Sequence, residues 1–221
     1  VSRVVNGSTK VSEKTRRKVL DVMEQCGYTP NVFARGLGLD SMKTIGILCP
    51  DISDAFIAQA VAFLEERLHQ YEYDCILGCS GYNLEAKEAH MKMLLSKRID
   101  ALILVSSTYA GREGHPEDVE YIIEAAKQTP VFLVNGFVEG DNIYCSFGDD
   151  FKATYDVTNG FIRRGKKKIL FLCDSYSYSA SKKMAGYEAA LQDAGYPIRG
   201  ELKFYTKNRI HHVRDILLSH K

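Results

Sequence analysis

The sequence predicts an α/β protein with a small helical unit in front of it, and three observations lead to this prediction. From Thr44 onward, apolar strand-like runs alternate with helical patterns of about 10–15 residues, which is typical of a parallel sheet covered on both faces. The residues before Thr44 read as helices. Residues 1–45 also carry eight basic and four acidic side chains, although the formal net charge of the 221-residue chain is only +1. This asymmetry indicates a polyanionic partner at the N-terminal end, or else a solvated helix face.

The helical unit has clear start and stop signals. Ser12 is a good N-cap for a helix over Glu13–Gln25, and Gly27 is a typical C-terminal stop. Thr29 to Asn31 then break the chain, and Asn31 can cap a second, short helix that runs as far as Leu37. A helix this short is marginal in water, so we expect it to form only against a partner. The buried stripe expected for the first helix consists of Val19, Leu20, Val22 and Met23.

The α/β part divides into six predicted strands and six predicted helices. The strands are Ile45–Cys49, Tyr73–Leu77, Ala101–Val105, Val131–Val134, Lys168–Cys173 and Leu202–Tyr205. The helices are Phe56–Gln70, Glu85–Ser96, Val119–Gln128, Phe151–Arg164, Ser181–Ala194 and His211–Ser219.

The two ends of the sequence shape the expected domain organisation. The chain starts inside what reads as a helix, and the alternation stops at Lys221 with too few strands to close a second core. We therefore expect both ends to be cut and the second α/β unit to be incomplete. The predicted division is 1–28 for the first helical unit, 29–43 for the second helix and a linker, 44–148 for the first α/β unit and 149–221 for the second.

Several functional classes find no support in the sequence. The six cysteines are scattered without a CxxC pair, and Cys75 and Cys79 lack a second Cys/His pair at zinc-site spacing, so we expect reduced thiols, no metal and a cytoplasmic protein. No apolar run approaches the roughly 18 residues that span a bilayer. Gly36-Leu-Gly38 is not a dinucleotide fingerprint and no Walker loop occurs. His211, His212 and Asp215 read as solvated helix surface, so we expect no catalytic residues and no cofactor.

A series of recognisable motifs runs in order along the whole chain. The motifs are Val1-Ser-Arg-Val-Val-Asn-Gly7, Val11-Ser-Glu-Lys-Thr-Arg16, Gly27-Tyr-Thr-Pro-Asn31, Ala34-Arg-Gly-Leu37, Ile45-Gly-Ile-Leu-Cys-Pro-Asp-Ile-Ser53, Lys97-Arg-Ile-Asp-Ala-Leu-Ile-Leu104, Phe161-Ile-Arg-Arg-Gly-Lys-Lys-Lys-Ile169 and Met184-Ala-Gly-Tyr-Glu-Ala-Ala190. Together they resemble the lac-repressor (LacI/GalR) family of bacterial transcription regulators. Each motif is weak alone, but their shared order makes the resemblance specific.

The resemblance implies a helix-turn-helix headpiece, a hinge helix and a two-lobed, periplasmic-binding-protein-like sensor that forms a homodimer. Against that plan the chain is expected to lack the front of the headpiece and the last part of the sensor. The implied function is that of a sequence-specific DNA-binding regulator, in the first place a repressor, of a pseudo-palindromic operator. A small-molecule effector, a sugar or a related metabolite, would control its affinity for the operator. A periplasmic-type sugar-binding protein without DNA function is the alternative.

The resemblance also assigns DNA contacts to six positions. Arg3 falls where the family places a base-reading arginine, whose fork can donate two hydrogen bonds to guanine. Ser2 and Asn6 match positions that touch phosphate, although Asn6 also suits a turn before Gly7. Leu37 matches the leucine that the hinge helix inserts into the minor groove, where an apolar wedge bends the duplex; Leu39 is a second candidate. The remaining assigned positions, Asn31 and Ala34, lie on the hinge.

Ligands of open α/β sheets bind beyond the carboxyl ends of the strands, and the loops there are rich in hydroxyls, amides and aromatic rings. A sugar ring needs this chemistry. The chain has Asp54-Ala-Phe56 where the family usually has Asn-Pro-Phe, and Lys183 where it usually has an arginine. Asp149 matches an acidic position of the family, with capping of the next helix as an equal alternative. The complete set of candidate effector contacts is Ser53, Asp54, Phe56, Ser80, Ser106, Asn135, Asp149 and Lys183.

Overall fold

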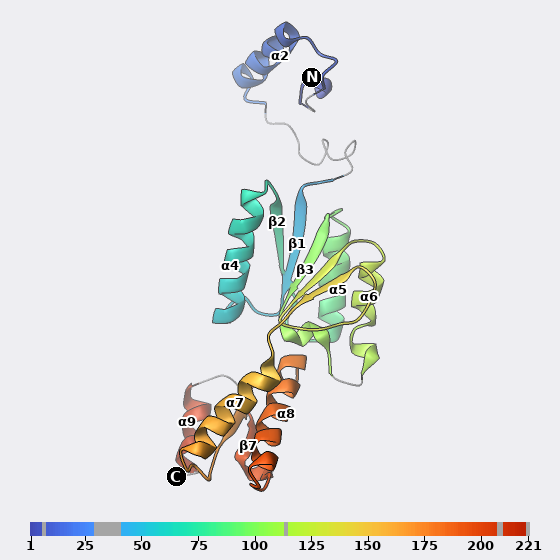
Figure 1. The fold of residues 1–221 in the computed structure, drawn as a ribbon. Coiled ribbons are helices and arrows are strands. Elements are labelled where there is room, and N and C mark those ends of the chain that lie inside the picture. Colours follow the sequence, from blue (N-terminus) through green and yellow to red (C-terminus); the bar gives the residue numbers. More distant parts are fainter. Residues whose placement is uncertain (6–7, 29–40, 113–114, 207–209, 220–221) are drawn as a thin grey trace.

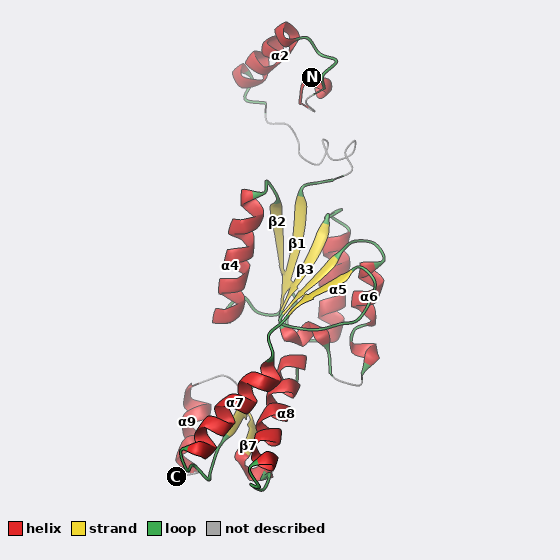
Figure 2. Ribbon diagram, in the orientation of Figure 1, coloured by secondary structure: helices red, strands yellow, loops and turns green. Residues whose placement is uncertain are grey.

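The computed structural model describes residues 1–5, 8–28, 41–112, 115–206 and 210–219. Its elements form a short helical unit, a five-stranded sheet with helices on both faces and a smaller α/β unit (Figures 1 and 2). The predicted α/β class with parallel sheets is confirmed.

The helical unit consists of α1 (Ser2–Val5) and α2 (Glu13–Gln25). The predicted cap is confirmed, because the Ser12 hydroxyl accepts a hydrogen bond from the backbone N–H of Thr15 at 3.3 Å. Gly27 ends the helix with φ +58°, a left-handed conformation that glycine adopts without a Cβ penalty. Arg16 fixes α1 on α2, since its guanidinium donates to the carbonyl oxygens of Val4 and Ser8 at 3.3 and 2.7 Å.

The predicted buried stripe of α2 is wrong. None of the described residues of α2 is buried, and Leu20 and Val22 are 47% and 56% exposed. Val19 and Met23 are half-buried. Leu20 and Val22 stay exposed because, among the described residues, α2 packs against the four-residue α1, which covers too little of the apolar face of α2. The predicted second helix over Asn31 to Leu37 lies outside the described residues.

The first sheet has the strand order β2-β1-β3-β4-β5, and all neighbouring pairs are parallel. Helix α4 covers one face, where Ile57 and Val61 pack on alternate residues of β1 and β3. Helices α5 and α6 cover the other face (Figure 1), where Met91, Leu94 and Ile122 form the larger core. Continuous burial of β1 and β3 explains why their sequences are unbroken apolar runs. The elements are β1 (Thr44–Cys49), α4 (Ala55–Gln70), β2 (Asp74–Cys79), α5 (Leu84–Leu95), β3 (Ala101–Val105), α6 (Glu120–Ala126), β4 (Val131–Val134) and β5 (Ile143–Ser146), with 3₁₀ turns η1 (Ser107–Ala110) and η2 (Pro116–Asp118).

Strand β5 was absent from the sequence prediction. It pairs in parallel with β4, and Tyr144 and Ser146 are exposed between half-buried neighbours. No helix separates β4 from β5, so the alternation that marked the other strands gives no signal there. The other predicted strands and helices of the α/β part are present, with ends that differ by up to three residues, as is usual for helix and strand boundaries.

The second α/β unit begins after β5. Its two strands pair in parallel, and α7 and α8 pack closely on each other. Gly186 of α8 permits this approach, because a Cβ there would overlap the backbone carbonyl of Phe151 and lie 3.1 Å from the nitrogen of Tyr155. The elements are α7 (Asp150–Arg163), β6 (Phe171–Cys173), α8 (Tyr178–Asp193), η3 (Gly200–Leu202), β7 (Lys203–Tyr205) and α9 (Ile210–Ser219).

Within the described residues, none of the helices combines the length and the apolar character that crossing a membrane requires.

Candidate ligand cavity and DNA-contacting segment

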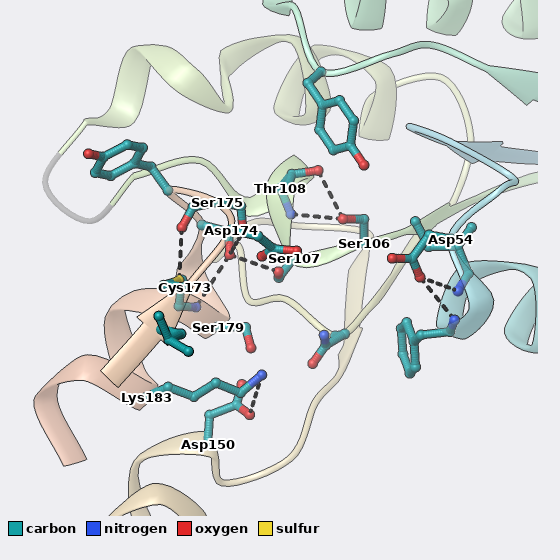
Figure 3. Close-up of a pocket in the computed structure, with 18 of the residues that line it drawn as sticks. Asp54, Ser106, Ser107, Thr108, Asp150, Cys173, Asp174, Ser175, Ser179 and Lys183 are labelled. Atoms are coloured by element: carbon teal, nitrogen blue, oxygen red, sulfur yellow. Dashed lines mark hydrogen bonds and ion pairs between the residues drawn. The ribbon is translucent and has the colours of Figure 1, made fainter. Parts of the chain in front are cut away.

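A cavity of about 1050 Å³ lies between the two α/β units, at the carboxyl ends of their strands. Residues that follow β1, β3 and β4 line it on one side, and the segment from β6 into α8 lines it on the other (Figure 3). Two parallel sheets therefore present their carboxyl edges to the same space, which is the position expected for a ligand.

Hydroxyl groups from both units meet at the cavity wall. Ser107, at the start of η1, donates a hydrogen bond from its hydroxyl to the hydroxyl of Ser177 at 3.0 Å. Both side chains are buried, and Ser177 caps α8 by accepting from the N–H of Ala180. Ser106 caps η1 and shares a 2.9 Å hydrogen bond with the hydroxyl of Thr108. The sequence after β3 thus builds one polar edge of the cavity and connects it to the other unit.

The hydroxyl of Ser179, also in this wall, has no hydrogen-bond partner within the described part of the protein. The Ser179 side chain is 3% exposed and lines the cavity. A buried hydroxyl without a partner destabilises the fold, so the site favours an incoming hydrogen-bonding group.

Lys183 lies one helical turn beyond Ser179, and its Nζ is 3.5 Å from a carboxylate oxygen of Asp150. Figure 3 shows Ser179, Lys183 and Asp150 together on the side of the cavity formed by the second unit. The ammonium group supplies donors, and the carboxylate supplies acceptors. The pair can therefore hold a ligand with neighbouring hydroxyl groups.

Lys87 is a cavity residue that the sequence analysis missed. Its side chain is 7% exposed, and its Nζ donates to the carbonyl oxygen of Thr108 at 2.6 Å and lies 5.2 Å from the centre of the Tyr109 ring. Burial lowers the pKa of this amine, and the negative charge of Asp118 opposes the shift. Its spacing to Met91 and Leu94, on the buried side of α5, is the sequence signal that could have revealed it.

Five of the eight candidate effector residues line the cavity: Asp54, Phe56, Ser106, Asn135 and Lys183. One carboxylate oxygen of Asp54 accepts from the N–H groups of Phe56 and Ile57 at 2.9 and 3.1 Å, so this side chain also caps α4. Phe56 is 54% exposed and offers a ring surface to the cavity.

The other three candidates, Ser53, Ser80 and Asp149, lie outside the cavity lining. Ser53 is exposed, and its N–H donates to Asp51. Ser80 is buried, with its hydroxyl 2.7 Å from that of Tyr109. Asp149 caps α7 by accepting from the N–H of Lys152 at 2.8 Å. The capping alternative is thus the one realised at Asp149, and the acidic residue on the cavity is its neighbour Asp150.

Of the candidate DNA-contacting residues, Ser2 and Arg3 lie in α1, and the side chain of Arg3 is exposed. Asn6, Asn31, Ala34 and Leu37 lie outside the described residues. The chain after residue 40 is anchored on the first sheet by Asp100. Its carboxylate accepts hydrogen bonds at 2.9 Å from the hydroxyl of Ser41 and from the N–H groups of Met42 and Thr44.

Two family models together match nearly all of the chain. One, described as "Bacterial regulatory proteins, lacI family", matches residues 1–31. The other, described as "Periplasmic binding proteins and sugar binding domain of LacI family", matches residues 42–220. The chain belongs to the LacI family of bacterial regulatory proteins.

Individual curated proteins are also similar to the chain. An HTH-type transcriptional regulator of Lachnoclostridium phytofermentans is 48% identical over 219 residues, which cover 99% of this chain and 65% of the relative. Catabolite control protein A of Priestia megaterium is 35% identical over 204 residues, or 90% of this chain and 58% of the relative. The chain thus spans less than two thirds of the length of these curated relatives.

Solved structures agree on the fold. The lac repressor dimer bound to operator and the anti-inducer ONPF matches with a TM-score of 0.81 at 22% identity, covering 99% of this chain and 66% of that one. A complex of the transcriptional regulator CelR with cellobiose matches with a TM-score of 0.64 at 20% identity, covering 98% of this chain and 65% of that one.

In the described part of the chain, no group of three or more histidine, cysteine, aspartate or glutamate side chains is arranged to hold a metal ion. His211 and His212 lie on α9 with their rings 4.2 Å apart, and Asp215 pairs with Arg214.

Proposed function

We propose that this LacI-family chain is part of a homodimeric transcriptional regulator that binds a pseudo-palindromic DNA operator and acts as a repressor. A carbohydrate or related polyol, bound in the cavity between the two α/β units, controls its affinity for the operator. The observation that carries the proposal is the pairing of this cavity with an N-terminal segment that matches the family model of lacI-type bacterial regulatory proteins.

The lining of the cavity supports a polyol as effector. Its hydroxyl-bearing side chains and the Lys183–Asp150 pair offer both donors and acceptors, and Phe56 offers an apolar ring. A sugar has a hydroxylated rim and flatter C–H faces, so it can use both kinds of surface. The charged side chains that line the cavity are of both signs, because Lys87 and Lys183 line it together with Asp54, Asp150 and Asp174, and this balance favours an uncharged ligand.

The N-terminal segment supports a DNA partner. Arg3 is exposed on α1, while Arg16 and Val4 hold that helix on α2. We propose that Arg3 reads a guanine, that Ser2 and Asn6 contact phosphates and that Asn31, Ala34 and Leu37 act in the hinge, with Leu37 as the minor-groove wedge. The match of residues 1–31 disfavours the alternative of a periplasmic-type sugar-binding protein without DNA function.

Control by the effector follows from the position of its site between two units. A ligand that contacts both sides stabilises a closed arrangement, and it changes DNA affinity only by as much as its own affinity differs between the two arrangements. Asp100 connects the first sheet to the chain that leads to the hinge, because its carboxylate holds residues 41–44 by hydrogen bonds. A movement of the first unit would therefore be passed on to the hinge through Asp100.

A thermal-shift screen of the complete natural protein against neutral sugars, sugar phosphates and nucleobases tests the effector class. A neutral sugar should raise the melting temperature in a concentration-dependent way, because a ligand that binds the folded state stabilises it. A shift produced by nucleobases alone would contradict the polyol assignment.

Ser179→Ala should weaken binding of that sugar roughly threefold to tenfold, the value of one hydrogen bond to a neutral group. The same change should leave the melting temperature of the ligand-free protein unchanged or slightly higher, because it removes an unsatisfied buried hydroxyl. Titration calorimetry and thermal denaturation measure the two effects. Ser181→Ala, on the same helix but away from the cavity lining, is the matched control. If Ser179→Ala and Ser181→Ala bound the sugar with equal affinity, Ser179 would not contact the sugar.

A further inference from the structure

Two cysteines stand side by side at the carboxyl ends of neighbouring strands. Cys49 is the last residue of β1 and Cys79 the last of β2, and the two are direct partners in the parallel register. Their sulfur atoms are 3.8 Å apart, and both are free thiols. Nothing in the proposed regulatory function uses this pair, since neither residue lines the cavity.

The backbone already has the spacing of a disulfide. Neighbouring strands lie about 4.7–4.9 Å apart, which falls within the Cα–Cα range of roughly 4.4–6.8 Å found in disulfides. Residues paired in register also send their side chains to the same face of the sheet. A bond of about 2.05 Å between these sulfurs, which are now 3.8 Å apart, therefore requires rotation of the two side chains and at most a small approach of the strands.

The two thiols differ in access to solvent. Cys49 is fully buried, whereas Cys79 is exposed. Burial first, and then the hydrogen bond with Cys79, raises the pKa of the Cys49 thiol to about 12. Cys49 therefore keeps its proton at neutral pH, and Cys79 is the thiol that a solution reagent can reach and that reacts first.

We propose that Cys49 and Cys79 form a disulfide-forming site that reacts with low-molecular-weight disulfides. The Cys79 thiolate attacks one sulfur of the reagent, forms a mixed disulfide and expels one thiolate. Cys49 then attacks the Cys79 sulfur and breaks the mixed disulfide, and its proton passes to the second thiolate that leaves. Two protein thiols are oxidised to one disulfide, and one reagent disulfide is reduced to two thiols.

The other cysteines lack this arrangement. Cys75 lies on β2 with Cys79, but its partner in the register is Ile45. The sulfur atoms of Cys145 and Cys173 contact backbone groups of Val138 and Ser175. Across the described ranges, Cys49 and Cys79 are the one pair of sulfurs within hydrogen-bonding distance.

The bond would join the starts of two loops that lead to the cavity. Asp54 follows β1 and Tyr82 follows β2, and both line the cavity. The disulfide would also close a loop of about 30 residues, which restricts the unfolded chain. Oxidation should therefore raise the melting temperature by several degrees.

Peptide mapping after exposure of the folded protein to oxidised glutathione tests the proposal. After acid quenching, alkylation and trypsin digestion, peptide 44–67 should be linked to peptide 68–87, with Cys75 alkylated. Cys75→Ser should keep the link and Cys79→Ser should abolish it. Cys49→Ala should stop the reaction at one glutathione bound to Cys79.

Three results would overturn the site: a link through Cys75, a link that persists in Cys79→Ser, or stable glutathione adducts on the unsubstituted protein without any link. The first two are read from the same digest of the unsubstituted protein and its variants. The third needs only the unsubstituted protein, so the test does not depend on how well the Cys49→Ala variant folds.

Discussion

Replacing Gly186 with alanine should cost the second α/β unit about 3 kcal/mol of stability, the upper end of the usual range for overpacking. The added Cβ would overlap the carbonyl oxygen of Phe151 and crowd the nitrogen of Tyr155. Both are backbone atoms of α7, so no side-chain rotation can relieve the contact, and α7 and α8 must separate. Urea denaturation followed by circular dichroism would measure the loss as a lower midpoint.

Gly160→Ala is the matched control for that experiment. Gly160 lies in the interior of α7, and a Cβ there would meet nothing within 4 Å. Alanine has the higher helix propensity, so this change should stabilise the protein by roughly 0.5–1 kcal/mol. If Gly186→Ala shifted the midpoint in the same direction as Gly160→Ala, the close approach of α7 and α8 would be wrong.

Replacing Arg3 with alanine should reduce discrimination between the operator and a base-substituted operator by about 5- to 150-fold. This corresponds to the roughly 1–3 kcal/mol that a bidentate arginine–guanine contact supplies. Because the side chain is exposed and Arg16 rather than Arg3 holds α1 in place, its removal should leave the fold intact. The complete natural protein, titrated by fluorescence anisotropy against duplexes with single base changes, gives the ratio of affinities.

Arg17→Ala removes the same charge from α2, where the side chain of Arg17 is 78% exposed and lies 3.7 Å from Glu13. Removal of a charge that acts on phosphates alone should weaken binding to every duplex by a similar factor. Loss of base discrimination in Arg17→Ala, with discrimination unchanged in Arg3→Ala, would reverse the assignment of the two residues.

The fold was largely predictable because helices separate most of the strands along the sequence. Ala101–Val105 and Val131–Val134 were predicted to the residue for this reason. Strand β5 was missed because it is half exposed and follows β4 without a helix. The apolar residues of α2 were wrongly placed in a core because periodicity shows which residues share a helix face, but not whether a partner is large enough to cover it.

The candidate site was predictable at the level of loops rather than side chains. The rule that ligands bind beyond the carboxyl ends of parallel strands located Asp54, Ser106 and Asn135 on the cavity. The rule could not tell which of Asp149 and Asp150 lines the cavity. The two residues are consecutive at the start of α7, and only the directions of their side chains distinguish them. The unpaired hydroxyl of Ser179 and the contact between Cys49 and Cys79 arise from tertiary packing, which no local pattern encodes.

The most direct test of the proposed function is the operator affinity of the complete natural protein at rising concentrations of the sugar that raises its melting temperature. The operator would first be selected from a pool of random DNA duplexes. We predict that the selected duplex contains an inverted repeat, and that the sugar changes its affinity at least fivefold, the lower end of allosteric coupling. A specific duplex whose affinity stays constant while the sugar saturates the cavity would contradict control by the effector.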